Sequence, residues 1–173
     1  MKKKLLYVLL LAFSMVTACS NSVDQVIDSP LYNGGKLVIG VVGKTPEVRE
    51  KNIEFKKLTM DALKRENLSA KYDAVFIMKK YLSEASEAPY AKIYRSAGVP
   101  FFFMGSETIS IPFTVEEISY DNFEHSDYYA TGSYQSGEDR QGWDFAIDKI
   151  NKANVQDTYT KIFTIIGHID DQK

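Results

Sequence analysis

The sequence predicts an α/β fold: a small three-layer, flavodoxin-like or Rossmann-like domain with about four parallel strands in the order 2-1-3-4. Short apolar runs alternate along the chain with amphipathic stretches of helical periodicity. The chain has 173 residues, 45% of them apolar, which is enough for one hydrophobic core. Because strands that alternate with helices at this spacing form right-handed crossovers, a parallel sheet covered on both faces is expected.

The first strand and helix are predicted from a sharp change of pattern after Gly35. Residues 37–42 form a β-branched apolar run that is too short for a helix, as is typical of strands buried on both faces. Thr45 is then a candidate N-cap, with proline at the first helical position. Apolar residues at helical spacing predict that this helix continues to about Asn67.

The same pattern repeats through the rest of the chain. Residues 73–78 predict strand two, and residues 83–97 predict an amphipathic helix closed by glycine. Residues 99–104 predict strand three. Residues 138–151 have helical periodicity, and the apolar run at residues 161–166 predicts strand four.

A long connection, residues 106–137, lies between strand three and the last predicted helix. It is too long for an ordinary link and should contain structure of its own. A capping-box pattern predicts a short helix over residues 115–119. Residues 128–134 fit either an extra edge strand or an ordered loop, and both alternatives stay open.

The N-terminus has the pattern of an export signal. Three lysines precede an apolar run at residues 5–16, followed by small residues. A run of about 12 residues is shorter than the roughly 20 that span a bilayer, so residues 1–18 are predicted to be a removed signal peptide. Residues 19–35 are rich in Asn, Ser, Asp and Gly and predict a flexible tether, which leaves residues 36–173 as a single domain.

The segment Val16-Thr17-Ala18-Cys19 resembles the lipobox of bacterial lipoproteins. The resemblance implies that the Cys19 sulfur receives a diacylglyceryl group and that the signal peptidase cleaves before Cys19. The mature protein would then be lipid-anchored on the extracytoplasmic side of the cell membrane, because two acyl chains give stable anchoring. An ordinary secretory signal with a chance cysteine, or a buried core cysteine, is the alternative.

Composition excludes several kinds of site. One cysteine permits no internal disulfide, and two histidines with one cysteine cannot build the usual four-ligand zinc site. The chain has 21 basic and 23 acidic residues, so no nucleic-acid-binding arm is expected. No cofactor motif is present in the sequence.

One ligand crevice is predicted from the expected strand order. In open α/β sheets, ligands bind beyond the carboxyl ends of strands, where the order reverses. The order 2-1-3-4 places this point between the loops after strands one and three, so the candidate ligand-binding residues are Lys44, Thr45, Ser106 and Glu107. Lys44 at a helix N-terminus favours an anion. The alternative is that Thr45 is only a helix cap.

Ser106, His168 and Asp170 each follow a predicted strand at this edge, which suggests a hydrolytic triad. However, Ser106 lies in no G-x-S-x-G motif, and the chain order differs from that of α/β-hydrolases. No catalytic residue is therefore assigned. The sequence favours a non-enzymatic ligand-binding or protein-interaction domain, with a cell-envelope hydrolase using Ser106 and His168 as the alternative.

Charge is distributed unevenly along the chain. Residues 44–95 carry twelve basic and eight acidic residues, whereas residues 96–139 carry eight acids and neither Lys nor Arg. The acidic part suggests a surface for a cationic protein, a basic peptide or a metal ion. A solvated loop whose aromatic residues pack on the domain has the same composition. The candidate residues are Asp121, Glu124, His125, Asp127, Tyr128 and Tyr129.

Overall fold

The computed structural model describes residues 29–170. The predicted signal peptide and Cys19 lie outside this part. Within it, no helix combines the length and the apolar character needed to cross a membrane.

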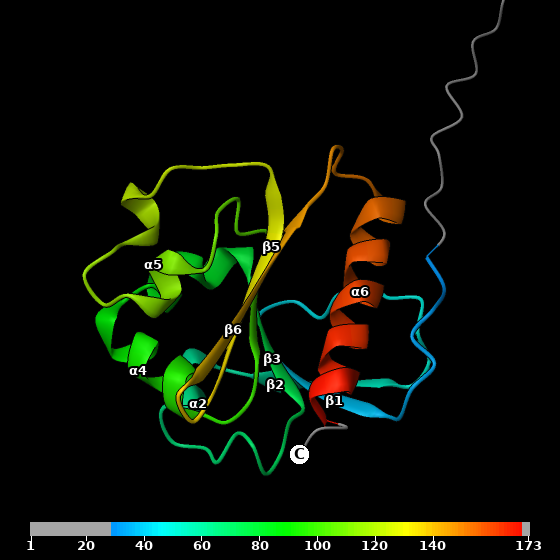
Figure 1. The fold of residues 1–173 in the computed structure, drawn as a ribbon, viewed down its shortest axis with the longest axis horizontal. Coiled ribbons are helices and arrows are strands. Elements are labelled where there is room, and N and C mark those ends of the chain that lie inside the picture. The colour runs from blue at the N-terminus through cyan, green and yellow to red at the C-terminus, as the bar shows by residue number, and fades with distance from the viewer. Residues whose placement is uncertain (1–28, 171–173) are drawn as a thin grey trace, which may run out of the picture.

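A single mixed sheet of six strands forms the centre of the fold, in the order β2-β1-β3-β4-β5-β6 (Figure 1). The first four strands in this order are parallel, and the last two are antiparallel to their neighbours. The predicted α/β class is therefore confirmed, with a sheet that is only partly parallel. The strands are β1 (Leu37–Val42), β2 (Ile53–Leu58), β3 (Ala74–Met78), β4 (Phe101–Met104), β5 (Tyr128–Ser136) and β6 (Asp139–Ala146).

Helices lie on both faces of the sheet. The long α6 (Lys152–Asp170) packs on one face, and the shorter helices lie on the other side in Figure 1. Alternate residues of each central strand enter the two cores, so that Phe76 packs on α6 and Val75 packs on the other face. The remaining helices are α2 (Met60–Leu63), α3 (Leu82–Ala85), α4 (Ala88–Ser96) and α5 (Ile111–Thr114), with 3-10 turns η1 (Lys79–Tyr81) and η2 (Tyr120–Asn122).

Aromatic packing holds α6 on the sheet. The ring of Phe76 stacks with that of Phe163 at 6.1 Å and lies 5.9 Å from that of Tyr159. These three side chains are at most 1% exposed. Burial of each such side chain contributes roughly 1.5–3 kcal/mol, so the contact fixes the position of α6 over β3.

The predicted helix from Thr45 to Asn67 is wrong. Residues 53–58 form β2, which pairs in parallel with the whole of β1, and only residues 60–63 are helical. Phe55 lies 6.4 Å from the rings of both Phe76 and Phe163. Because Ile53 and Phe55 alternate with charged residues, the segment satisfies a strand period as well as a helical one, and pairing with β1 decides between them.

Two predicted elements near the C-terminus are also wrong. The helix at residues 138–151 is the strand β6, which forms a hairpin with β5 through Gly137 at φ 60°. The strand at residues 161–166 is part of α6. Its apolar run is the buried face of a 19-residue helix, whose inward residues are Ile162, Phe163, Ile166 and Ile169.

The predicted strand order also needs correction. It placed residues 73–78 and 99–104 on opposite sides of residues 37–42, whereas β3 lies between β1 and β4. The second neighbour of β1 is β2, the strand that the helix prediction concealed. The connection at residues 106–137 does contain structure of its own: α5, η2 and β5.

Two local predictions within that connection have different outcomes. Residues 115–119 are not helical, because the helical turns lie on either side, at residues 111–114 and 120–122. Residues 128–134 are a strand rather than a loop. This strand, β5, is an interior one, since β6 covers its outer side.

Candidate functional site

The strand order reverses between β1 and β3, because the chain leaves β1 for β2 on one side and then crosses to β3 on the other. Gly43 turns the chain after β1 at φ 121°, and a Cβ there would lie 2.9 Å from Cβ of Met78. Gly105 turns the chain after β4 at φ 71°, and a Cβ there would lie 3.1 Å from Cβ of Lys79. Only glycine allows both loops to approach the end of β3 so closely.

A pocket of about 680 Å³ opens at this point. Four lysines from three parts of the chain line it: Lys44 after β1, Lys57 in β2, and Lys79 and Lys80 after β3. Two acids, Asp61 and Glu84, also line it. The carboxyl ends of three parallel strands therefore surround a pocket in which basic side chains outnumber acidic ones.

The lysines of this pocket differ in how far their charge is compensated. Lys79 Nζ donates a hydrogen bond to the carboxylate of Glu107, and this bond raises the pKa of Lys79. Lys80 Nζ lies 5.8 Å from the centre of the Tyr81 ring. Among residues 29–170, Lys44, Lys57 and Lys80 have no ion pair. Their charge is therefore available to a bound anion.

Two further hollows continue along the same edge. One, of about 300 Å³, shares Lys44 and Met78 with the lysine-lined pocket and is also lined by Thr45, Tyr129 and Tyr159. Burial raises the pKa of both tyrosines, so both stay neutral at physiological pH. The other hollow, of about 490 Å³, is lined by Lys79, Glu107, Asp127, Tyr128 and Tyr129.

Glu107 has an unusual backbone conformation for a residue that is not glycine, with φ 52°. Its carboxylate accepts from Lys79 and lies 3.6 Å from Nδ1 of His125. Its carbonyl oxygen accepts from the amide of Ser126 at 2.6 Å. Left-handed backbone at such a residue costs about 1–3 kcal/mol, and these contacts hold it in place beside the lysine-lined pocket.

The four predicted ligand-binding residues do not line one pocket. Lys44 and Thr45 follow β1, whereas Ser106 and Glu107 follow β4, and β3 lies between the two loops. Lys44 and Thr45 share the 300 Å³ hollow, and Glu107 lines the 490 Å³ hollow. Ser106 is fully buried, and its hydroxyl donates to the carbonyl oxygen of Thr108 at 3.0 Å.

Three lysines of the pocket were missed by the sequence reasoning. Lys79 and Lys80 directly follow the run at residues 73–78, so their position after a strand was a usable signal. Lys57 was concealed, because its segment was assigned to a helix.

Ser106 and His168 are not brought together. The first residue of α6, Lys152, lies near the carboxyl ends of the parallel strands, because its Nζ is 3.4 Å from Oε2 of Glu47 in the loop after β1. His168 is sixteen residues further along the same helix. At 1.5 Å per residue it lies roughly 24 Å away along the helix axis. No hydrolytic triad can form from the two residues in this arrangement.

The acids of the predicted cation surface are spread over their segment. Asp121 Oδ1 accepts from Ser83 Oγ at 2.6 Å, and the His125 ring lies edge-on to Tyr120. Asp127 lines the 490 Å³ hollow, and Glu124 is exposed. In the described part of the chain, no three His, Cys, Asp or Glu side chains are grouped so that they could hold a metal ion.

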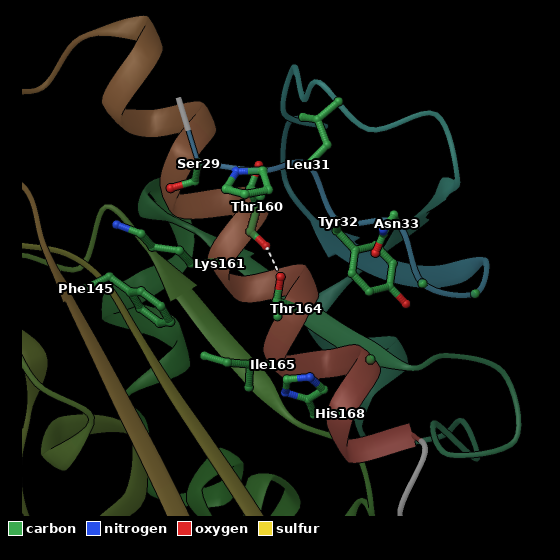
Figure 2. Close-up of a pocket in the computed structure, with 14 residues that line it drawn as sticks. Ser29, Leu31, Tyr32, Asn33, Phe145, Thr160, Lys161, Thr164, Ile165 and His168 are labelled. Atoms are coloured by element: carbon green, nitrogen blue, oxygen red, sulfur yellow. Dashed lines mark hydrogen bonds between the residues drawn. The ribbon is translucent and has the colours of Figure 1, made fainter. Parts of the chain in front are cut away.

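Another pocket, of about 810 Å³, lies elsewhere, between residues 29–35 and α6 (Figure 2). Tyr32 lies against Gly167, where a Cβ would be 2.7 Å from the ring. Thr164 Oγ1 donates to the carbonyl oxygen of Thr160 at 3.0 Å, as the dashed line shows. Lys161 lines this pocket too, but its Nζ pairs with Asp157 at 2.9 Å. The pocket thus differs from the lysine-lined one, where three of the four ammonium groups have no ion pair in the described structure.

Comparison with known proteins identifies no relative: no family model, curated protein or solved structure matches the chain. The residues that line the strand edge, and their charges, are therefore the basis on which a function is proposed.

Proposed function

We propose that this protein is a lipid-anchored, extracytoplasmic binding domain that holds a small phosphate-bearing anion, without turnover, in the lysine-lined pocket. The observation that carries the proposal is the convergence of Lys44, Lys57, Lys79 and Lys80 where the strand order reverses. The volume of about 680 Å³ lies within the range of small-molecule pockets, roughly 300–1,000 Å³.

The charges favour a phosphate group over a neutral ligand. Lys44 and Lys57 have no ion pair within residues 29–170, and two ammonium groups match the double negative charge of a phosphate monoester. Two unit charges 4 Å apart attract each other by about 4 kcal/mol at the effective dielectric near a protein surface, before the cost of removing water. Because this attraction is electrostatic, we expect added salt to weaken the binding of the anion.

The lining supports the binding of an anion. It provides four lysines against two acids, Asp61 and Glu84, together with the hydroxyls of Thr59 and Tyr81. The alternative hydrolase that uses Ser106 and His168 has no support in the geometry of those residues. Turnover of an ester that is abolished by Ser106→Ala would overturn the binding proposal.

The lipid anchor is part of the same proposal. Its support is the signal peptide at residues 1–18, followed by the lipobox that ends at Cys19. The described domain begins ten residues later, at Ser29. An anchor at Cys19 would therefore leave the lysine-lined pocket outside the cytoplasmic membrane.

A cationic partner at residues 121–127 is a second candidate. The observation that favours it is that Glu124 and Asp127 are exposed and, within the described residues, have no ion pair. Neutralisation of both to Gln and Asn should reduce the capture of a basic peptide such as oligolysine at low salt. Equal capture by the neutralised variant would show that the segment is only a surface loop.

The anion proposal is tested by calorimetry on the full chain in detergent, with inorganic phosphate, glycerol phosphate and an uncharged sugar as probes. We expect binding of at least one phosphate compound and none of the sugar. Lys57→Ala should weaken this binding about tenfold, the equivalent of about 1.4 kcal/mol.

Lys56→Ala is the matched control, because Lys56 is on the same strand but does not line the pocket, and its Nζ pairs with Glu54 at 3.6 Å. It should bind as the wild type does. Equal weakening by both variants would mean that only general surface charge matters, and would contradict the proposal. Absence of binding by every phosphate compound would contradict it as well.

A further inference from the structure

Strand β6 (Asp139–Ala146) ends the sheet, and within residues 29–170 its outer edge has no partner strand. Most of its residues are exposed, and only Trp143 and Phe145 are half-buried. An eight-residue edge offers a row of free backbone N–H and C=O groups that can pair with another strand. The opposite edge strand, β2, has six residues and carries two adjacent lysines, which discourage such pairing.

We propose that β6 pairs antiparallel with β6 of a second copy of this chain, about a two-fold axis at Gly142. The sheets of the two copies then form one continuous sheet. This is an isologous interface, in which the same strand contributes to both sides. The inference does not depend on the anion-binding proposal.

The charges on β6 are complementary to themselves in this register. Pairing about Gly142 places residues at equal distances from it opposite each other, so Arg140 faces Asp144 of the partner subunit, and the reverse pair forms as well. A two-fold axis at Gln141 or at Trp143 would place neither charge opposite its counterpart. Opposite charges directly across an antiparallel pair favour the register, and here one register forms two such pairs.

Both charged side chains are already held by the chain itself. Arg140 donates to Oγ1 of Thr114, and Asp144 Oδ1 accepts from Oγ1 of Thr131 at 2.6 Å. A guanidinium has five donors and a carboxylate has two oxygens, so each keeps hydrogen-bonding capacity for a second partner. Each of the two groups can therefore form a second hydrogen bond across the two-fold axis.

Gly142 is not required by the fold of a single copy. A Cβ there would lie 3.7 Å from the carbonyl oxygen of Gly132 and 4.0 Å from Ser110 Oγ, which are ordinary contacts. Its φ is outside the left-handed region that favours glycine. In contrast, a two-fold axis at this residue brings two backbones together at the same point, and a strand glycine commonly marks such a close approach.

The experiment is a charge exchange followed by analytical ultracentrifugation of the full chain in detergent. Wild type should sediment as a dimer of chains. Arg140→Asp and Asp144→Arg should each weaken association at least tenfold, because each creates two like-charge pairs across the axis. An equal mixture of the two variants should recover the dimer, since every pair across the interface is then opposite in charge.

The mixture also reports on folding, because a variant that had lost its fold would not regain association. The chain has one tryptophan, Trp143, so its fluorescence should change with dimerisation. A monomeric wild type would overturn the proposal, even if β6 bound a peptide of another protein. Failure of the mixture to recover the dimer while both variants keep the wild-type circular dichroism would also overturn it.

A cysteine pair tests the register directly. Gly142→Cys places the two sulfurs opposite each other at the axis, so oxidation should give a covalent dimer. Ser136→Cys on β5 is exposed and away from the axis, and both variants retain Cys19, so Ser136→Cys should give no more cross-linking than wild type. Equal cross-linking of the two variants would overturn the register.

Discussion

Lys79 and Glu107 form an ion pair across the carboxyl ends of two adjacent parallel strands. Lys79 follows β3, Glu107 follows β4 after the turn at Gly105, and the carboxylate accepts a hydrogen bond from Nζ. The carboxylate holds the pKa of Lys79 above its ordinary value of 10.5. Glu107 thus compensates the charge of one of the four lysines of the pocket, which is a different role from the ligand contact that its position suggested.

Removal of the Glu107 charge should strengthen anion binding. Glu107→Gln keeps the size of the side chain but leaves Lys79 without its carboxylate, so the net positive charge of the lysine-lined pocket rises. We expect the affinity for the phosphate probe to rise about threefold to tenfold at low salt, as measured by calorimetry. Glu117→Gln, an exposed acid that does not line this pocket, is the control and should leave the affinity unchanged. Weaker binding by Glu107→Gln would instead mean that the carboxylate itself contacts the ligand.

The backbone at Glu107 predicts an unusual order of stability among its variants. Glu107→Ala and Glu107→Gly both remove the ion pair with Lys79, but only glycine also relieves the left-handed φ of 52°. The free energy of unfolding of Glu107→Gly should therefore exceed that of Glu107→Ala by about 1 kcal/mol, although alanine is usually the more stabilising residue. Urea denaturation of both variants measures the difference. If alanine were the more stable residue, position 107 would not be strained.

The fold was predictable from the sequence where one local pattern allowed one answer. The run at residues 37–42 and the triple phenylalanine at 101–103 are buried on both faces and formed the expected strands. Prediction failed where the apolar residues of a segment fit both the helical and the strand periodicity. Residues 53–58 and 161–166 each fit a helix and a strand, and the choice depends on tertiary neighbours that no local pattern contains.

The choice of candidate site residues depended on the predicted strands. Lys44 was chosen because it follows a correctly assigned strand, and it lines the lysine-lined pocket. Ser106 was chosen by the same reasoning, but its hydroxyl is buried against the backbone of Thr108, which a strand assignment cannot show. Lys57 was not predicted as a site residue, because the helical spacing of its neighbours led to a helix assignment for a segment that is a strand.

A second ion pair predicts a pH-dependent contribution to stability. The hydrogen bond from Arg95, 2.6 Å from Glu116 Oε1, holds the pKa of Glu116 below its ordinary value of 4.5. A carboxyl whose pKa is lower in the folded state stabilises the fold above the unfolded pKa, and this contribution disappears as the pH falls through the folded pKa. Glu116→Gln should thus be less stable than wild type at pH 7, and the difference should vanish as the pH falls well below 4.5.

Urea unfolding at several pH values measures this difference. Glu117→Gln is the matched control, because the neighbouring side chain is exposed and forms no ion pair within the described structure. It should follow the wild type at every pH. If the difference in unfolding free energy between Glu116→Gln and wild type stayed constant from pH 7 to pH 3, the ion pair would not be the cause of the lower stability.

Cys19 should decide where the protein is found. If the Val16-Thr17-Ala18-Cys19 segment is a lipobox, the anchor is a lipid on the Cys19 sulfur, and Cys19→Ala removes its only attachment atom. No helix in residues 29–170 is long and apolar enough to replace it as a membrane span. Cell fractionation should show wild type in the membrane fraction, and the variant either released or retained as an uncleaved precursor of higher mass.

Ser20→Ala is the control for this substitution, because it changes the next residue and leaves the sulfur in place. It should stay in the membrane fraction at the mature mass. Metabolic labelling with palmitate should mark wild type and Ser20→Ala but not Cys19→Ala, which separates lipid attachment from simple adsorption to the membrane. Retention of Cys19→Ala in the membrane fraction at the mature mass would mean that the domain is held there by another contact and that the lipid anchor is wrong.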